Sequence, residues 1–196
     1  LLDTAEVSAA GRLLAELPRI SGRQFGWQRD NFIGSTPQVN TGHADWPAFF
    51  AERRLRPQLD LARTRGHHGR LIADGERLAE TLRVLFVDHQ PPASLLHGDL
   101  WSGNAAIDES GILALFDPAV HFGDRECDLA MSELFGGFPE RFYAAYREAW
   151  PIPGGYRQRR TLYQLYHILN HLNLFGGGYR QQAEAMLAAL LAETGH

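Results

Sequence analysis

The stretch His97-Gly98-Asp99-Leu100-Trp101-Ser102-Gly103-Asn104 decides how the rest of the chain is interpreted. An apolar run at 105–107 follows it, and residues 108–111 have the composition of a turn. A second apolar run, 112–116, then leads directly to Asp117. The pattern predicts a polar loop, a β-hairpin, and an acidic residue where that hairpin ends.

Asp99, Asn104 and Asp117 are groups of the kind that phosphoryl transfer from a nucleotide requires. One carboxylate accepts the proton of the attacking hydroxyl, while an amide carbonyl and a second carboxylate hold Mg²⁺ against the triphosphate. Asp99 and Asn104 are five residues apart, which is the separation of the base and the asparagine in the catalytic loop of protein kinases. Each residue alone is also typical of a turn, but the combined pattern favours a catalytic site.

Length, composition and charge limit the function further. The chain has 196 residues, of which 44% are hydrophobic, so it can form a substantial core. Its net charge of −4 argues against a nucleic-acid or membrane-surface partner. One cysteine, Cys127, excludes an internal disulfide and fits a reducing compartment. We therefore expect a soluble, cytoplasmic protein, with its oligomeric state left open.

Two sequence features of nucleotide-binding lobes are missing. All 19 basic residues are arginine, so the chain has no lysine, and it contains no G-x-G-x-x-G. Kinase-like enzymes hold the nucleotide phosphates with a strand-borne lysine and a cover loop on an N-terminal lobe. We therefore expect residues 1–196 to form a C-terminal catalytic lobe, with the nucleotide-binding lobe absent from this chain, and activity of the chain alone is in question.

The apolar spacing predicts a mainly helical α+β fold. Helices are expected over about 4–17, 45–61, 70–87, 124–135, 138–150, 158–175 and 181–192. Asp45 is the predicted N-cap of the second helix, and Pro57 should bend that helix or end a turn of it. The segment 21–45 is expected to be a loop that docks on the core through Phe25, Trp27, Phe32 and Ile33.

Two acidic residues near residue 125 have two interpretations. Asp124 and Asp128 stand in the predicted first turn of a helix, where acidic side chains commonly cap the backbone. Either one is equally suited to hold the Asp99 loop by accepting hydrogen bonds from its backbone or from an arginine. The sequence does not distinguish capping from loop support.

The helix predicted over 158–175 carries an unusual polar group. His167 and His171 have the i, i+4 spacing of a zinc site, but the glutamate of H-E-x-x-H is missing, which argues against a metal. Asn170, His171 and Asn173 form a polar cluster on an otherwise aromatic helix. Because buried polar groups need partners, the cluster is either a satisfied core network or the wall of a ligand pocket.

The opening stretch resembles the fructosamine kinase (ketosamine-3-kinase) family, a branch of the aminoglycoside phosphotransferase-like kinases with a protein-kinase-like fold. Asp117-Pro118-Ala119 is similar to the metal-binding motif of that family. Three other segments resemble it as well: Ser35-Thr36-Pro37-Gln38-Val39-Asn40, Leu134-Phe135-Gly136-Gly137-Phe138, and Leu162-Tyr163-Gln164-Leu165 leading to Leu169-Asn170-His171. The resemblance runs from about Val7 to Tyr179.

The resemblance implies ATP-dependent phosphorylation of a sugar hydroxyl, at O3, on a small-molecule or protein-bound ketoamine, which leads to deglycation. It implies Asp99 as the general base, and Asn104 and Asp117 as the ligands of Mg²⁺ beside ATP. It further implies that Trp101 is a platform for the sugar and that His171 lines the substrate pocket. His97 would orient the loop, and Gln38 and Asn40 receive no role.

Two alternatives remain. The first is another small-molecule kinase of the aminoglycoside phosphotransferase superfamily. A pocket for a polycationic antibiotic should be rich in acidic residues, whereas Trp101 and the aromatic helix favour a neutral sugar. The second is an inactive truncated lobe that acts only as a binding module, against which the three intact positions Asp99, Asn104 and Asp117 argue.

Overall fold

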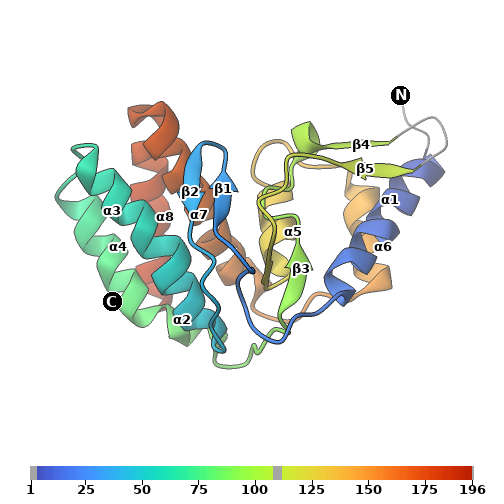
Figure 1. The fold of residues 1–196 in the computed structure, drawn as a ribbon, viewed down its shortest axis with the longest axis horizontal. Helices are drawn as coiled ribbons and strands as arrows, with labels where there is room; N and C mark the ends of the chain where they lie inside the picture. Colours follow the sequence, from blue (N-terminus) through green and yellow to red (C-terminus); the bar gives the residue numbers. More distant parts are fainter. Residues whose placement is uncertain (1–3, 108–111, 196) are drawn as a thin grey trace.

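The computed structural model describes residues 4–107 and 112–195, so the turn predicted at 108–111 lies outside the described residues. Figure 1 shows a chain of helices with three small sheets. The helices are α1 (Thr4–Glu16), α2 (Trp46–Phe50), α3 (Arg56–Thr64), α4 (Arg70–Thr81), α5 (Glu126–Ser132), α6 (Glu140–Ala149), α7 (Tyr156–Phe175) and α8 (Arg180–Glu193). The strands are β1 (Asn31–Ile33), β2 (Thr36–Gln38), β3 (Ser94–Leu96), β4 (Ala105–Ile107), β5 (Leu113–Leu115) and β6 (His121–Gly123). Short helical turns are η1 (Leu17–Arg19), η2 (Ala51–Leu55), η3 (Leu82–Phe86), η4 (Ser102–Asn104) and η5 (Gly177–Tyr179).

Two hydrophobic cores lie on either side of α5. Helices α3 and α8 pack against α7, and α4 packs against α3 and α8, so the four share the larger core, whereas α1 and α6 pack against each other and enclose the smaller one (Figure 1). Ala130 of α5 belongs to the larger core, and the neighbouring Leu129 belongs to the smaller one. Leu100 of the opening stretch is also in the smaller core. The predicted catalytic loop is therefore anchored where the two cores meet.

The second helical region begins as predicted. Asp45 Oδ2 accepts a hydrogen bond from the backbone N–H of Ala48 at 3.0 Å, which caps α2. The backbone then passes through the π-helical turn η2 before α3, where Pro57 occupies the first turn. Leu55 and Arg56 both have helical backbone angles, so Pro57 lies in a continuous helical path, and the irregular turn falls immediately before it.

The segment 21–45 differs in part from the expected docked loop. It contains the hairpin β1–β2, in which Asn31 pairs with Gln38 and Ile33 with Thr36. Ile33 is buried, as predicted, but Phe32 is 60% exposed, so the prediction of Phe32 as an anchor was wrong. Successive side chains of a strand point to opposite faces, so both could not reach the core.

The small sheets place the opening stretch between two antiparallel pairings. The predicted hairpin is present as β4–β5, with Ala105 opposite Leu115. Strand β3, which leads into the stretch, pairs with β6 rather than with a neighbour in sequence.

Helix α4 ends at Thr81 and continues as η3, so the helix expected over 70–87 is shorter than predicted. None of the helices in the described part of the chain is long and apolar enough to cross a membrane.

Candidate active site

Gly98 allows the opening stretch to approach the segment that follows Asp117. Its φ is +82°, and a Cβ at this position would lie 2.2 Å from the carbonyl oxygen of Ala119. A larger residue would meet both a steric clash and an unfavourable backbone conformation. The glycine therefore fixes the loop against the Asp117–Ala119 backbone.

Asp128 holds the same loop from the other side. Its Oδ2 accepts a hydrogen bond from His97 N at 2.8 Å, and its Oδ1 accepts one from Gly98 N at 2.9 Å. Burial raises the pKa of Asp128, whereas His97 and the two backbone N–H groups act to lower it. Asp124 instead caps α5 by accepting a bond from Glu126 N at 3.0 Å. The structure thus assigns loop support to Asp128 and capping to Asp124.

His97 links the loop to the end of β5. Its Nδ1 accepts a hydrogen bond from Asp99 N at 3.2 Å, so the ring proton is on Nε2, which donates to Phe116 O at 2.9 Å. One imidazole therefore bridges the residue before Asp117 and the backbone of Asp99. This geometry agrees with an orienting role for His97.

The side chain of Asn104 reaches back to Asp99. Its Nδ2 donates to Asp99 O at 3.0 Å and lies 3.3 Å from Asp99 Oδ2. The amide nitrogen is committed in this way, so the carbonyl Oδ1 is the atom that Asn104 can offer to a ligand. The side chain of Asp99 is 22% exposed. Burial raises the pKa of Asp99, while His97, His171 and the Asn104 hydrogen bond act to lower it.

Asp117 lies next to Asn104 across the hairpin. Phe116 N donates to Asn104 O at 3.1 Å, which continues the β4–β5 pairing as far as the residue before Asp117. Asp117 is exposed, and it is the one non-glycine residue with positive φ (53°) in the described part of the chain. Asn104 offers an amide oxygen and Asp117 a carboxylate, which are the hard oxygen donors that Mg²⁺ prefers.

The hairpin β1–β2 supports the segment after Asp117, a role that the sequence did not reveal. Gln38 Nε2 donates to Ala119 O at 3.1 Å, and Asn31 Nδ2 donates to Val120 O at 2.8 Å. Gln38 is buried, and its Oε1 accepts a bond from Tyr166 OH at 2.8 Å. The only sequence signal for this contact was the motif at 35–40, which carried no role by itself.

A row of rings extends outward from the loop. Trp101 is 37% exposed, and its ring centroid lies 6.5 Å from that of Phe135, which lies 4.7 Å from that of His171. His171 is followed by Phe175 at 5.4 Å and Tyr179 at 5.2 Å. We call these five residues the aromatic wall. His171 Nδ1 donates to the backbone oxygen one helical turn earlier, which leaves Nε2 for a ligand.

The polar cluster predicted on α7 divides between core and surface. Asn173 Nδ2 donates to Gln58 Oε1 at 2.8 Å, and Gln58 Nε2 donates to Asn170 Oδ1 at 3.2 Å. Both asparagines are buried, whereas His171 is partly exposed in the aromatic wall. The two asparagines therefore belong to a buried hydrogen-bond network, in which Asn173 Oδ1 has no partner within the described residues, and His171 as a pocket wall stays a prediction.

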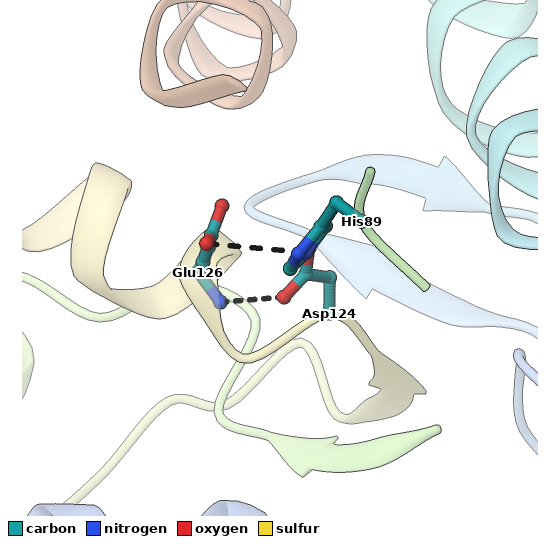
Figure 2. Close-up of side chains that lie close together, drawn as sticks. All are labelled: His89, Asp124 and Glu126. Carbon is teal, nitrogen blue, oxygen red and sulfur yellow. Dashed lines mark hydrogen bonds and ion pairs between the residues drawn. The ribbon is translucent and has the colours of Figure 1, made fainter. Parts of the chain in front are cut away.

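A second group, of one histidine and two carboxylates, lies at the start of α5 (Figure 2). His89 Nε2 donates to Asp124 Oδ2 at 2.6 Å, and the ligand atoms of His89, Asp124 and Glu126 lie within 4.8 Å of one another. Both oxygens of Glu126 also accept bonds from Arg159, at 2.7 and 2.9 Å, and Tyr163 OH donates to Asp124 Oδ2 at 2.7 Å. We call these five residues the His89 cluster. Because Arg159 already holds the Glu126 carboxylate, the cluster is a buried ion-pair network rather than a metal site.

Comparison with known proteins agrees with this geometry. The fructosamine kinase family model matches residues 2–193. The chain belongs to the fructosamine kinase family. It is 52% identical over 182 residues to a protein of Synechocystis named as a probable ketoamine kinase, and 45% identical over 179 residues to a chloroplastic protein-ribulosamine 3-kinase of Arabidopsis thaliana.

These matches cover most of this chain but only part of each relative. They include 92% and 90% of the chain, against 61% and 55% of the two proteins, so the chain spans little more than half the length of such relatives. A crystal structure assigned to the fructosamine-3-kinases, from Thermobifida fusca, superposes with a TM-score of 0.91 at 35% identity. That match covers 98% of this chain and 67% of the other. The kinase-like, mainly helical fold predicted from the sequence is confirmed.

Proposed function

We propose that the protein to which this chain belongs transfers the γ-phosphoryl group of ATP to O3 of the sugar of a ketoamine. The observation that carries the proposal is the single loop–hairpin unit on which Asp99, Asn104 and Asp117 lie. Family membership and the names of the relatives support the reaction class. The phosphorylated sugar then separates from the amine, which gives deglycation.

Asp99 is the general base in this proposal. It accepts the proton of the sugar hydroxyl as the new O–P bond forms, and the bond between the γ-phosphorus and the β-bridging oxygen breaks to release ADP. Its carboxylate is partly buried, yet 22% of the side chain remains accessible. The raised pKa of Asp99 makes the carboxylate a stronger proton acceptor than a fully hydrated one.

Asn104 and Asp117 fit a magnesium ion. Asn104 offers Oδ1, since its Nδ2 is bound to Asp99, and Asp117 is an exposed residue that follows Phe116, whose backbone N–H donates to Asn104 O. When bound with ATP, Mg²⁺ neutralises the charge that develops on the phosphate oxygens. The positive φ of Asp117 and the Gln38 and Asn31 contacts behind it fix where that carboxylate stands.

The aromatic wall is the proposed binding surface for the ketoamine. Trp101 stands two residues after Asp99 in the opening stretch and its ring is 37% exposed, which suits stacking of a sugar. His171 contributes Nε2 to the same surface, and Phe135 lies between the two rings. None of the five residues of the aromatic wall is acidic, which suits a neutral sugar better than a polycationic antibiotic.

We further propose that residues 1–196 are the C-terminal catalytic lobe and that the nucleotide-binding lobe lies outside this chain. The partial coverage of the relatives and the missing lysine support this division. The single cysteine supports a reducing, cytoplasmic setting.

The base assignment can be tested with Asp99→Asn in the full-length protein. We expect kcat for a fructose-derived ketoamine of lysine to fall about 10²- to 10⁴-fold, because the amide cannot accept the hydroxyl proton. Affinity for Mg²⁺–ATP should stay within about twofold of wild type, since the variant removes no metal ligand. Steady-state kinetics and calorimetric titration of the nucleotide measure the two effects.

The matched control is Asp60→Asn, which removes an exposed carboxylate on α3. It should leave both quantities unchanged. An Asp99→Asn enzyme with wild-type kcat would refute the base assignment. A wild-type protein that phosphorylates aminoglycosides but no ketoamine would refute the substrate class.

A further inference from the structure

His167 presents an unpaired nitrogen to the proposed base. It lies on α7, one turn before His171, and is 4% exposed. Its Nδ1 has no hydrogen-bond partner within the described residues and is itself buried. The atom lies 3.9 Å from Asp99 Oδ1. A buried polar atom without a partner is unfavourable and rare in folded proteins, which points to a role for this nitrogen.

The contact is not an ion pair. Burial, together with the neighbouring His171 and Arg54, lowers the pKa of His167 to about 3, so the imidazole is neutral near pH 7. A neutral imidazole carries one N–H. With the proton on Nδ1, the ring offers a donor to the carboxylate; with the proton on Nε2, a lone pair would face a negatively charged oxygen. The first tautomer is the one that the surroundings of Asp99 favour.

The two oxygens of Asp99 have different neighbours. Oδ2 lies 3.3 Å from Asn104 Nδ2, whereas Oδ1 lies 3.9 Å from His167 Nδ1. The contact with His167 is longer than a hydrogen bond in this structure. Contacts of this kind are often long without substrate and shorten when the reacting complex forms. A donor on each oxygen would fix the plane of the carboxylate and direct the remaining lone pair of Oδ1 at the bound hydroxyl.

We propose that His167 is a positioning residue, whose Nδ1–H donates to Asp99 Oδ1 and orients the base toward the sugar hydroxyl. The expected effect of His167 on kcat rests on the proposed function, whereas the expected tautomer of His167 does not. In this proposal His167 acts through Asp99, and among the described residues no hydrogen bond joins it to Asn104 or Asp117. Asn104 and His167 together then hold the base from two elements, the opening loop and α7.

The tautomer can be measured directly. The full-length protein is labelled with ¹⁵N-histidine, and two-bond ¹H–¹⁵N correlation spectra identify which ring nitrogen of His167 is protonated. We expect a neutral ring protonated on Nδ1, whose proton resonance moves when Asp99 is replaced by Ala. A ring protonated on Nε2, or a resonance indifferent to Asp99→Ala, overturns the proposal. This result stands even if the protein proves to act on another substrate.

Kinetics of two substitutions test the positioning role. His167→Leu removes the donor, and we expect kcat for the ketoamine to fall about 100-fold, the size of effect produced by a misplaced reacting group. KM for ATP should remain within about twofold, because His167 does not contact the nucleotide. His167→Asn places an amide N–H near the site of Nδ1 and should restore kcat to within about threefold of wild type.

Leu172→Ala is the matched control for lost packing, because Leu172 is buried in the larger core on the same helix. It should lower the melting temperature without lowering kcat at temperatures where the protein is folded. Equal losses of kcat in His167→Leu and Leu172→Ala would show that His167 is only a packing residue. A fully active His167→Leu enzyme would overturn the proposal as well.

Discussion

The Asp99 site and the His89 cluster are built from the same kinds of residue but differ in how completely they are paired. In the His89 cluster, both oxygens of Glu126 are bound to Arg159, and Asp124 Oδ2 accepts from His89 and Tyr163. At the Asp99 site, one imidazole nitrogen lacks a partner and the carboxylate is partly exposed. Polar groups that are all hydrogen-bonded are typical of a structural network. Polar groups without a partner are instead typical of a ligand-binding site.

Helix α5 connects the two regions. Glu126 and Asp124 fix its first turn within the His89 cluster, and Asp128, half a turn further on, accepts two backbone hydrogen bonds from the Asp99 loop. The His89 cluster therefore fixes the position of Asp128, which in turn holds the Asp99 loop. This arrangement suits catalysis, which requires a base held in place by rigid surroundings.

Replacing Arg159 by Met should produce the largest change in stability among the variants that test this comparison. The substitution leaves the Glu126 carboxylate buried without its partner, which costs about 3–5 kcal/mol of unfolding free energy. Urea unfolding of the full-length protein at pH 7 measures the loss. The double variant Arg159→Met with Glu126→Leu should recover much of it, because neither charge then remains buried. A loss below about 1 kcal/mol in the single variant would show that the cluster is not closed.

The sequence predicted those parts of the site that depend on local spacing. The Asp99–Asn104 separation, the hairpin that follows and the Asp45 cap are properties of a few consecutive residues, and each was located correctly. The helix around His171 was also found, because a run of 20 residues shows its periodicity clearly. The roles of Asp99, Asn104 and Asp117 themselves stay predictions.

The rest depends on contacts between distant segments. Strands β1 and β2 contain Asn31, Thr36, Pro37 and Gln38, so they lack the apolar runs that marked the equally short β4 and β5. The hydrogen bond between Gln38 and Ala119 joins positions 81 residues apart. Neither segment carries a local pattern that predicts this contact. Asp124 and Asp128 have the same local pattern, so only the folded chain shows which one supports the loop.

The contribution of His167 to the pH dependence of the unfolding free energy should be smaller than the effect of Arg159→Met. His167 has a folded-state pKa of about 3, whereas an unfolded histidine titrates near 6.5. Between about pH 6.5 and pH 3, His167 is therefore protonated in the unfolded state but neutral in the folded state. Because the unfolded state binds the extra proton, the free energy of unfolding falls as the pH falls through this range. Over pH 6 to 4.5, wild-type unfolding free energy should fall more steeply than that of His167→Leu, by about 1.4 kcal/mol per pH unit.

Urea titrations of both proteins at several pH values measure this difference. Comparison with the variant is necessary because His121, whose pKa burial also lowers well below its usual value, contributes a similar slope to both. Parallel curves would mean that His167 is protonated in the folded protein, and that its contact with Asp99 is an ion pair.

Tyr163→Phe should produce the smallest loss of unfolding free energy among these variants. It also distinguishes most clearly between the His89 cluster and the Asp99 site. The phenol donates to Asp124 and accepts from Trp46 Nε1 at 3.0 Å, so its removal leaves one buried acceptor and one buried donor less satisfied. Asp124 keeps His89 as a donor, which limits the expected loss to about 1–2 kcal/mol. Denaturant unfolding gives this value, and kcat at a temperature where the variant is folded should equal that of wild type. If kcat instead fell in proportion to stability, the His89 cluster would be part of the catalytic apparatus, and complete pairing would no longer separate scaffold from site in this fold.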